Sequence, residues 1–163
     1  MKQFITHPFP PFYYKDSTVL ILGSFPSVKS REQKFFYGHP QNRFWRVTSG
    51  VFGCAEPHTL AEKREFLANN HIALWDVIAS CEIKGSSDSS ITNVTANDLS
   101  PILSQSNIRQ IFTNGKTAHK FYEKYTQSSV NRNAICLPST SPANAAWSVD
   151  SLIKAWNVII CPR

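Results

Sequence analysis

The sequence lacks the features that mark membrane, exported and metal-cluster proteins. No apolar run reaches the roughly 18 residues that a transmembrane helix needs, so we expect no membrane association. The stretch 1–16 is broken by prolines and contains no apolar signal core, which favours a cytoplasmic protein. The cysteines form no CxxC pair, so we expect buried free thiols and no metal site. These cysteines are Cys54, Cys81, Cys136 and Cys161.

What the sequence does contain is typical of one globular domain. Of the 163 residues, 42% are apolar and 17% are charged, which suits one domain with a real core over residues 1–163. Lysine and arginine number 17 against 11 aspartate and glutamate residues, giving a net charge of +6. This excess of positive charge favours a polyanionic partner.

Apolar runs and amphipathic segments alternate along the chain. Buried strands are predicted over 18–24, 72–77, 108–114 and 133–138. Helices are predicted over 42–52, 59–71, 97–106, 118–125 and 149–160. The second helix starts with a capping box, in which Thr59 is followed three residues later by Glu62. Strands separated by helices predict an α/β fold with a parallel sheet covered on both faces.

An unusual loop follows each predicted strand. The loops read GSFPS, WDV, TNGK and LPSTSPANA in chain order. Ligands of open α/β sheets bind at the carboxyl ends of the strands, so we expect these loops to form one composite site. Asn, Ser, Thr, Gly, Pro and aromatic residues suit stacking on a flat ring and hydrogen bonding to its edge, as a base flipped out of DNA requires.

Several common catalytic motifs are absent from these loops. There is no GxxxxGK[ST] phosphate loop, no GxGxxG dinucleotide fingerprint and no GxSxG nucleophile elbow. The loops after the first, third and fourth strands contain a single acid, Glu32, and Asp76 is the other candidate near that edge. A paired-carboxylate mechanism is therefore not expected. Asp76 either satisfies loop amides or has a catalytic role.

Three loop motifs stand out as a set: GSFPS at 23–27, FYGHPQNRFW at 36–45 and LPSTSPANA at 137–145. Together they resemble the uracil-DNA glycosylase superfamily. They are related to the mismatch-specific uracil/thymine glycosylases and are most similar to the hypoxanthine-DNA glycosylase branch, family 6. The resemblance extends from about residue 18 to the last helix. It implies a three-layer α/β/α sandwich with a four-stranded parallel sheet in the order second, first, third, fourth.

One departure from the family shifts the expected catalytic residue. In the mismatch-specific enzymes the third residue of the first motif is a catalytic Asn, whereas Phe25 stands there in this sequence. The hypoxanthine branch also lacks that Asn. The resemblance implies that the Asn of the HPxNxFW motif, which is Asn42 here, takes over the catalytic role. An amide does not titrate near neutral pH, so Asn42 would orient a water against C1′ of the sugar.

The resemblance also implies the residues that bind the base and the DNA. Backbone N–H groups of Ser24 and Phe25, and the side chain of Asn114, would donate to the base, and Tyr37 would stack on it. The loop after the last strand would enter the gap left by the flipped nucleotide or hold phosphates, helped by flanking residues. These DNA-binding residues are His39, Arg43, Lys116, Ser139, Thr140, Ser141, Pro142, Ala143 and Asn144.

Each of these residues also has a purely structural interpretation. Asn42 precedes a helix and would serve well as its N-cap. Tyr37 would pack in the core, His39 would sit in a turn before Pro40, and Asn114 would belong to a turn before a helix. Phe44 and Trp45 are expected in the core. The segment GSSDSS is either a phosphate contact or, as we prefer, a plain loop.

These observations predict a monofunctional DNA glycosylase of base excision repair. It would act without metal or cofactor, as a monomer, on DNA containing a deaminated base. Hypoxanthine from deoxyinosine is the favoured substrate, with uracil or xanthine as further candidates. The alternatives are a non-catalytic binder of damaged DNA with the same fold and, less favoured, a nucleoside hydrolase or nucleotide-binding protein.

Overall fold

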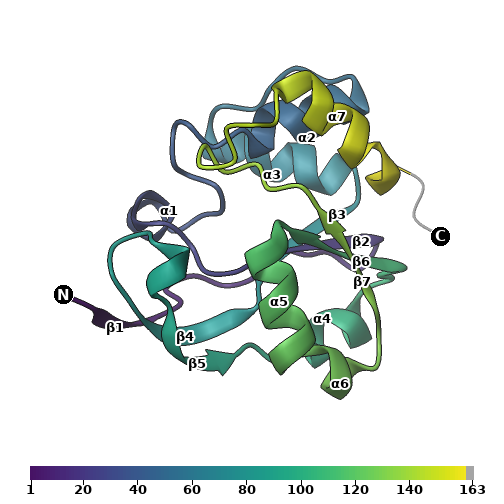
Figure 1. The fold of residues 1–163 in the computed structure, drawn as a ribbon. Helices are drawn as coiled ribbons and strands as arrows, with labels where there is room; N and C mark the ends of the chain where they lie inside the picture. Colours follow the sequence, from purple (N-terminus) through teal and green to yellow (C-terminus); the bar gives the residue numbers. More distant parts are fainter. Residues whose placement is uncertain (161–163) are drawn as a thin grey trace.

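A four-stranded parallel sheet forms the centre of the computed structural model, which describes residues 1–160 (Figure 1). The strands are β2 (Val19–Gly23), β3 (Ile72–Asp76), β6 (Gln110–Asn114) and β7 (Ala134–Leu137). They lie in the order β3-β2-β6-β7, which confirms the predicted order of second, first, third, fourth. The strands β2 and β3 are buried along their whole length, as their continuous apolar runs indicate.

Helices cover both sides of this sheet. On one side lie α2 (Phe44–Phe52), α3 (Leu60–Asn69) and α7 (Val149–Trp156), at the top of Figure 1. On the other lie α4 (Ser100–Gln105), α5 (Lys116–Tyr125) and α6 (Gln127–Val130). In the first group, α2 packs on α7 through Phe44 and Trp156, whose ring centroids are 5.9 Å apart. The three-layer α/β/α architecture is therefore confirmed.

A second, antiparallel sheet was not predicted. It contains β1 (Gln3–Thr6), β4 (Ile78–Ile83) and β5 (Thr92–Ala96), in the order β1-β4-β5. Only Val77 separates β3 from β4, so the apolar run gives no sign of a second strand. The strands β1 and β5 are largely exposed and polar and lack a buried pattern. The segment GSSDSS, which we expected to be a plain loop, contains a 3-10 turn, Asp88–Ser90, and β5 begins just after it at Thr92.

The predicted helices are confirmed with small shifts at their ends. The capping box of α3 is present, with Thr59 and Glu62 each accepting from the other's backbone N–H. The last helix ends at Trp156 and continues as a 3-10 turn, Asn157–Ile159. Two short helices were not predicted, α6 and α1 (Val28–Gln33), and α1 lies within the stretch treated as a loop.

The expectation of buried cysteines is wrong for two residues. Cys81 on β4 is buried, but Cys54 and Cys136 are exposed. Cys54 directly follows Gly53, the left-handed residue that ends α2, and Cys136 lies on β7, an edge strand. Cys161 falls outside the described residues. Within residues 1–160, no helix is long and apolar enough to cross a membrane.

Candidate active site

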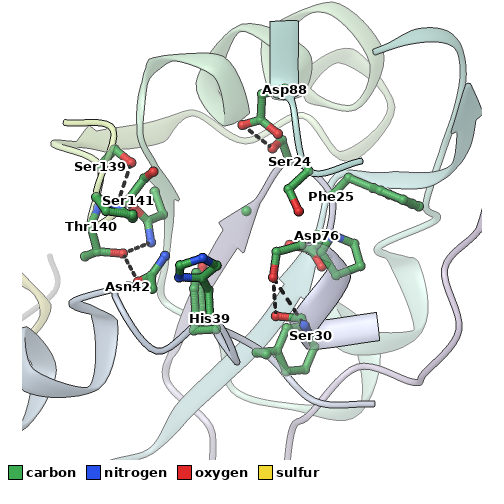
Figure 2. A pocket seen from close by; sticks show the side chains of 18 residues that line it. Ser24, Phe25, Ser30, His39, Asn42, Asp76, Asp88, Ser139, Thr140 and Ser141 are labelled. Atoms are coloured by element: carbon green, nitrogen blue, oxygen red, sulfur yellow. Dashed lines mark hydrogen bonds between the residues drawn. The ribbon is translucent and has the colours of Figure 1, made fainter. Parts of the chain in front are cut away.

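A pocket of about 260 Å³ opens where the loops after the parallel strands meet (Figure 2). Its volume is slightly below the ~300–1,000 Å³ of sites for drug-sized ligands, which leaves room for a single base. The loops that follow β2 and β7 contribute to its wall, together with Asp76 and Asn114, the last residues of β3 and β6. Its lining includes these predicted site residues: Ser24, Phe25, Tyr37, His39, Asn42, Asn114, Ser139, Thr140, Ser141 and Pro142. The composite site expected at this edge of the sheet is therefore present.

A network centred on Thr140 holds Asn42 in place. Thr140 is fully buried, its backbone N–H donates to Oδ1 of Asn114 and its hydroxyl accepts from Nδ2 of Asn114, both at 3.0 Å. The same hydroxyl donates to Oδ1 of Asn42 at 2.9 Å. The backbone N–H of Phe44 also donates to this oxygen, at 2.9 Å. Because a backbone N–H only donates, this contact fixes which end of the Asn42 amide is the oxygen.

The network leaves one polar group of Asn42 free for a ligand. Both lone pairs of Oδ1 are in use, and within the described residues no hydrogen bond engages Nδ2. Asn42 therefore offers the pocket a donor and no acceptor, which differs from the water-orienting amide expected above. Asn42 is not the N-cap of α2 that the sequence suggested, because Arg43 holds that position, but its Oδ1 still accepts from the first N–H of the helix.

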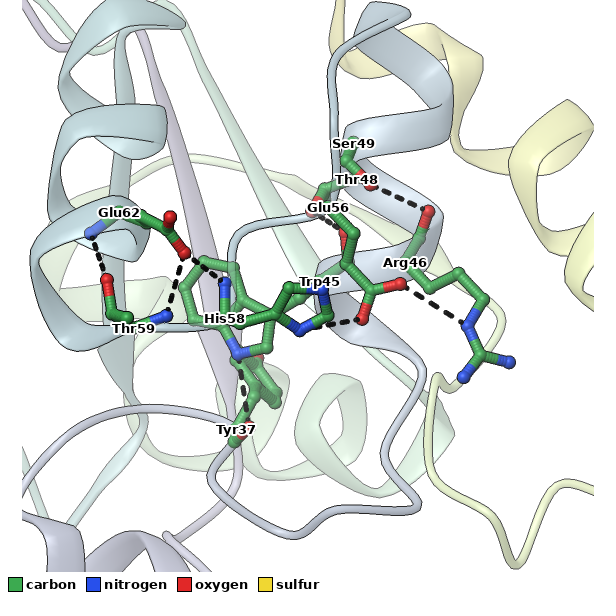
Figure 3. Close-up of polar contacts among 9 residues, drawn as sticks. All are labelled: Tyr37, Trp45, Arg46, Thr48, Ser49, Glu56, His58, Thr59 and Glu62. Carbon is green, nitrogen blue, oxygen red and sulfur yellow. Dashed lines mark hydrogen bonds and ion pairs between the residues drawn. The ribbon is translucent and has the colours of Figure 1, made fainter.

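Tyr37 packs against the protein with one face of its ring. The ring stacks on Phe44 with centroids 4.0 Å apart and an interplanar angle of 10°, which confirms the core-packing interpretation for that face. Its backbone has a φ of 52°, and its carbonyl accepts from Nε1 of Trp45 at 3.1 Å (Figure 3). The Tyr37 hydroxyl is buried without a hydrogen-bond partner in the described structure. Burial, reinforced by the charge of Asp76 and opposed by the nearby side-chain amide of Asn114, raises the pKa of this hydroxyl.

A buried His7–Asp76 pair lies at the pocket and was missed as a pair. Asp76 ends β3, lines the pocket and is 5% exposed. Its Oδ2 is 2.7 Å from Nε2 of His7, which reaches it from the segment after β1. The His7 ring packs edge-on against Phe9, with centroids 4.5 Å apart, and close to Trp75, at 4.4 Å. Nothing in the N-terminal sequence signals this contact, because it depends on the unpredicted sheet that contains β1.

Asp88 is a second carboxylate that the sequence interpretation left out. Its Oδ2 accepts from Oγ of Ser24 at 3.0 Å, on one side of the pocket (Figure 2). Desolvation raises the pKa of Asp88, the charge of Asp76 adds to this effect, and the Ser24 hydrogen bond opposes it. The residue lies in the segment 85–90, which we interpreted as a plain loop. The connection between β4 and β5 brings that segment back to the pocket.

Arg43 binds the loop after β7. Its guanidinium donates to the carbonyls of Ser141 at 2.8 Å, of Asn144 at 3.1 Å and of Thr140 at 3.4 Å, and also to that of Trp147. These bonds engage the guanidinium with protein oxygens, so the structure gives Arg43 a loop-holding position. Its predicted contact with phosphate stays a prediction.

The other predicted DNA-binding residues lie at the pocket or beside it. Nδ1 of His39 accepts from the backbone N–H of Gln41 at 3.1 Å, as expected of a turn, and His39 also lines the pocket. Lys116 is exposed at the first position of α5. Ala143 is exposed, and Nδ2 of Asn144 donates to the carbonyl of Ser139 at 3.0 Å. Three predicted residues lie outside the pocket lining: Lys116, Ala143 and Asn144. A duplex whose flipped base occupied the pocket would lie over that outer region.

Comparison with known proteins places this architecture in a family. The model of the uracil DNA glycosylase superfamily matches residues 10–159. A hypoxanthine DNA glycosylase of Methanosarcina acetivorans is 34% identical over 146 residues, covering 88% of this chain and 91% of the relative. A second one, of Methanosarcina barkeri, is 32% identical over 150 residues, covering 91% and 93%.

A solved structure supports the same assignment. The NMR structure of a Methanosarcina acetivorans protein assigned as a uracil DNA glycosylase superposes with a TM-score of 0.81 at 31% identity. The match covers 97% of this chain and 98% of the other. Sequence, fold and the loops around the pocket agree: the chain belongs to the uracil DNA glycosylase superfamily.

Proposed function

We propose that this protein is a monofunctional DNA glycosylase that removes hypoxanthine, with uracil or xanthine as further substrates, and leaves an abasic site. The observation that carries the proposal is the amide of Asn42, which Thr140 and Asn114 hold at the pocket with a free N–H group. The two relatives that act on hypoxanthine, each covering about nine tenths of this chain, support the choice of base.

The chemistry follows from where charge develops. Water attacks C1′, the bond from C1′ to the base breaks and its electron pair leaves with the base. The proton that the water loses passes through solvent to the departed base, so the products are an abasic site and the neutral base. The departing base becomes negative, so donors aimed at it stabilise the transition state more than the ground state. Because its oxygen is occupied, Asn42 serves as such a donor through Nδ2, and the backbone N–H groups of Ser24 and Phe25 assist.

DNA would bind across the mouth of the pocket. The loop 139–144, with exposed Pro142 and Ala143, enters the gap left by the flipped nucleotide. Exposed Lys116 at the start of α5 and the net charge of +6 favour the phosphate backbone. We expect the protein to act as a monomer.

The proposal is tested by single-turnover reactions on duplexes that carry one inosine, uracil, xanthine or thymine mismatch, followed by alkali. We expect cleavage at inosine, and Asn42→Ala should slow it by about 10²–10³-fold, as the loss of one preorganised donor does. Asn69→Ala, which removes an exposed amide at the end of α3, serves as the matched control and should react like wild type. If every duplex is bound and none is cleaved, a damaged-DNA-binding protein replaces the glycosylase.

A further inference from the structure

Two polar atoms, one of Asp76 and one of Tyr37, both lie close to Gly23 in the pocket. A Cβ placed on Gly23 would be 2.5 Å from Oδ1 of Asp76 and 3.4 Å from the hydroxyl oxygen of Tyr37. Within the described residues no hydrogen bond engages either atom, and the Tyr37 hydroxyl is buried. Buried polar groups are nearly always hydrogen-bonded, so an orphaned hydroxyl in a pocket points to a ligand that supplies its partner.

The two atoms differ in hydrogen-bond polarity. Oδ1 of an aspartate carboxylate only accepts, whereas the tyrosine hydroxyl has a proton to donate. An acceptor beside a donor is complementary to a lactam edge, in which a ring N–H stands next to a carbonyl. Hypoxanthine, uracil and xanthine have this edge, and adenine and cytosine have the opposite one, a bare ring nitrogen beside an amino group.

We propose that Asp76 and Tyr37 read the lactam edge that deamination creates, and that His7 is the positioning residue that aims Asp76. The ring N–H of the base donates to Oδ1 of Asp76, and the neighbouring carbonyl accepts from the Tyr37 hydroxyl. This inference rests on the proposed function and assigns its specificity. Adenine and cytosine would place a bare ring nitrogen against the Asp76 oxygen and an amino group against the Tyr37 hydroxyl, so two acceptors and two donors would face each other. Guanine shares the lactam edge, so its rejection lies elsewhere in the pocket.

His7 gives Asp76 a single orientation. Its Nε2 donates to Oδ2 at 2.7 Å, which leaves Oδ1 as the oxygen that faces Gly23 and the ligand. The His7 side chain is 3% exposed, and its Nδ1 has no partner in the described structure, so the bond to Asp76 is the polar contact that the ring makes. Gly23 is required at this point, because any side chain would displace the carboxylate.

The first test varies the base and needs no mutation. Duplexes that carry inosine or 1-methylinosine, which lacks the ring N–H, are compared for base release and for equilibrium binding by the wild-type protein. We expect the methylated base to be released at least 10²-fold more slowly, since a site built to bind an N–H group rejects a base without it. Equal release of both bases would overturn the inference and leave the glycosylase intact. If neither base is released, preferential binding of inosine would support the inference without the enzyme, and equal binding would overturn it.

The second test reverses the polarity at Asp76. In Asp76→Asn, His7 holds the amide oxygen, and the amino group replaces the acceptor that faced the ligand. The ratio of inosine to adenine binding should fall by tenfold or more, and His7→Phe, which retains the aromatic ring, should lower it in the same direction. Asp16→Asn breaks the exposed Asp16–His71 pair, whose atoms are 3.4 Å apart, and should leave the ratio unchanged. A variant that binds both duplexes more weakly at a constant ratio would show that Asp76 is only structural.

Discussion

At the scale of single residues, the pocket contains side chains that reduce the stability of the fold. The Tyr37 hydroxyl is buried without a partner, and Tyr37 itself has a left-handed backbone with a φ of 52°. A buried donor left unpaired costs about 1–3 kcal/mol. Strained residues of this kind are concentrated at functional sites, where the contacts of the surrounding structure hold them in place.

Tyr37→Phe should therefore separate stability from activity. Removing the unpaired hydroxyl should raise the free energy of unfolding by about 1 kcal/mol, since the ring still stacks on Phe44. The same change should slow hypoxanthine release, because the base loses a donor. Urea unfolding and single-turnover rates measure the two effects, and Tyr14→Phe on the exposed surface is the control. A less stable variant with full activity would contradict the assigned role.

The raised pKa of Asp88 predicts a modest dependence of stability on pH, modest because the residue as a whole is exposed. Because its pKa is raised, the folded state binds this proton more tightly than the unfolded chain, so the ionised form of Asp88 lowers stability at neutral pH. Asp88→Asn retains an acceptor for Ser24 and removes the charge. The variant should melt at a higher temperature than wild type near pH 7, and the difference should vanish below the ordinary aspartate pKa of about 3.9. Melting temperatures that agree at both pH values would count against a desolvated carboxylate.

At the scale of elements, the loop after β7 is held by hydrogen bonds to residues in other parts of the chain. The guanidinium of Arg43, at the start of α2, binds four of its carbonyls, and Thr140 ties it to Asn42 and Asn114. The loop and the amide of Asn42 are thus fixed by one set of contacts. A change that loosens the loop should also displace Asn42.

Arg43→Lys tests this coupling. A lysine amine keeps the charge but cannot span the carbonyls that the planar guanidinium reaches. Amide hydrogen exchange in residues 139–147 should become faster, and the rate of base release should fall on the order of 10²-fold, as misplaced catalytic groups cause. Arg46 lies three residues further along, where it is exposed and forms an ion pair with Glu56. Arg46→Lys should change neither the exchange rate of the loop nor the rate of base release. Unchanged exchange in the loop would show that Arg43 does not hold it.

The elements that the sequence predicts well are those with a local signal, either a continuous apolar run or a helix cap. The strands β2, β3 and β6 are buried runs, and the capping box marks the start of α3, so each is visible locally. The order of the strands required the family resemblance. The antiparallel sheet escaped prediction because the stability of β1 and β5 comes from pairing with β4, a long-range contact that leaves no period in the sequence.

At the scale of the whole molecule, the same distinction explains the site. Parallel strands bring their carboxyl ends to one edge, so residues in the loops that follow them could be assigned to one pocket from the sequence. His7 and Asp88 could not, because the antiparallel sheet delivers both to the pocket from outside those loops. The pocket, the loop that Arg43 holds beside it and the net charge of +6 are the features on which the proposed binding of DNA with one base turned inward rests.

If this protein breaks the glycosidic bond, the free base must be released, so we would first measure that release. Excess wild-type protein is mixed with a duplex that contains one inosine, and hypoxanthine is measured by mass spectrometry over time. We expect free hypoxanthine to appear in step with abasic sites and to approach one per duplex. Tight binding of the duplex with no free base at any time would contradict it.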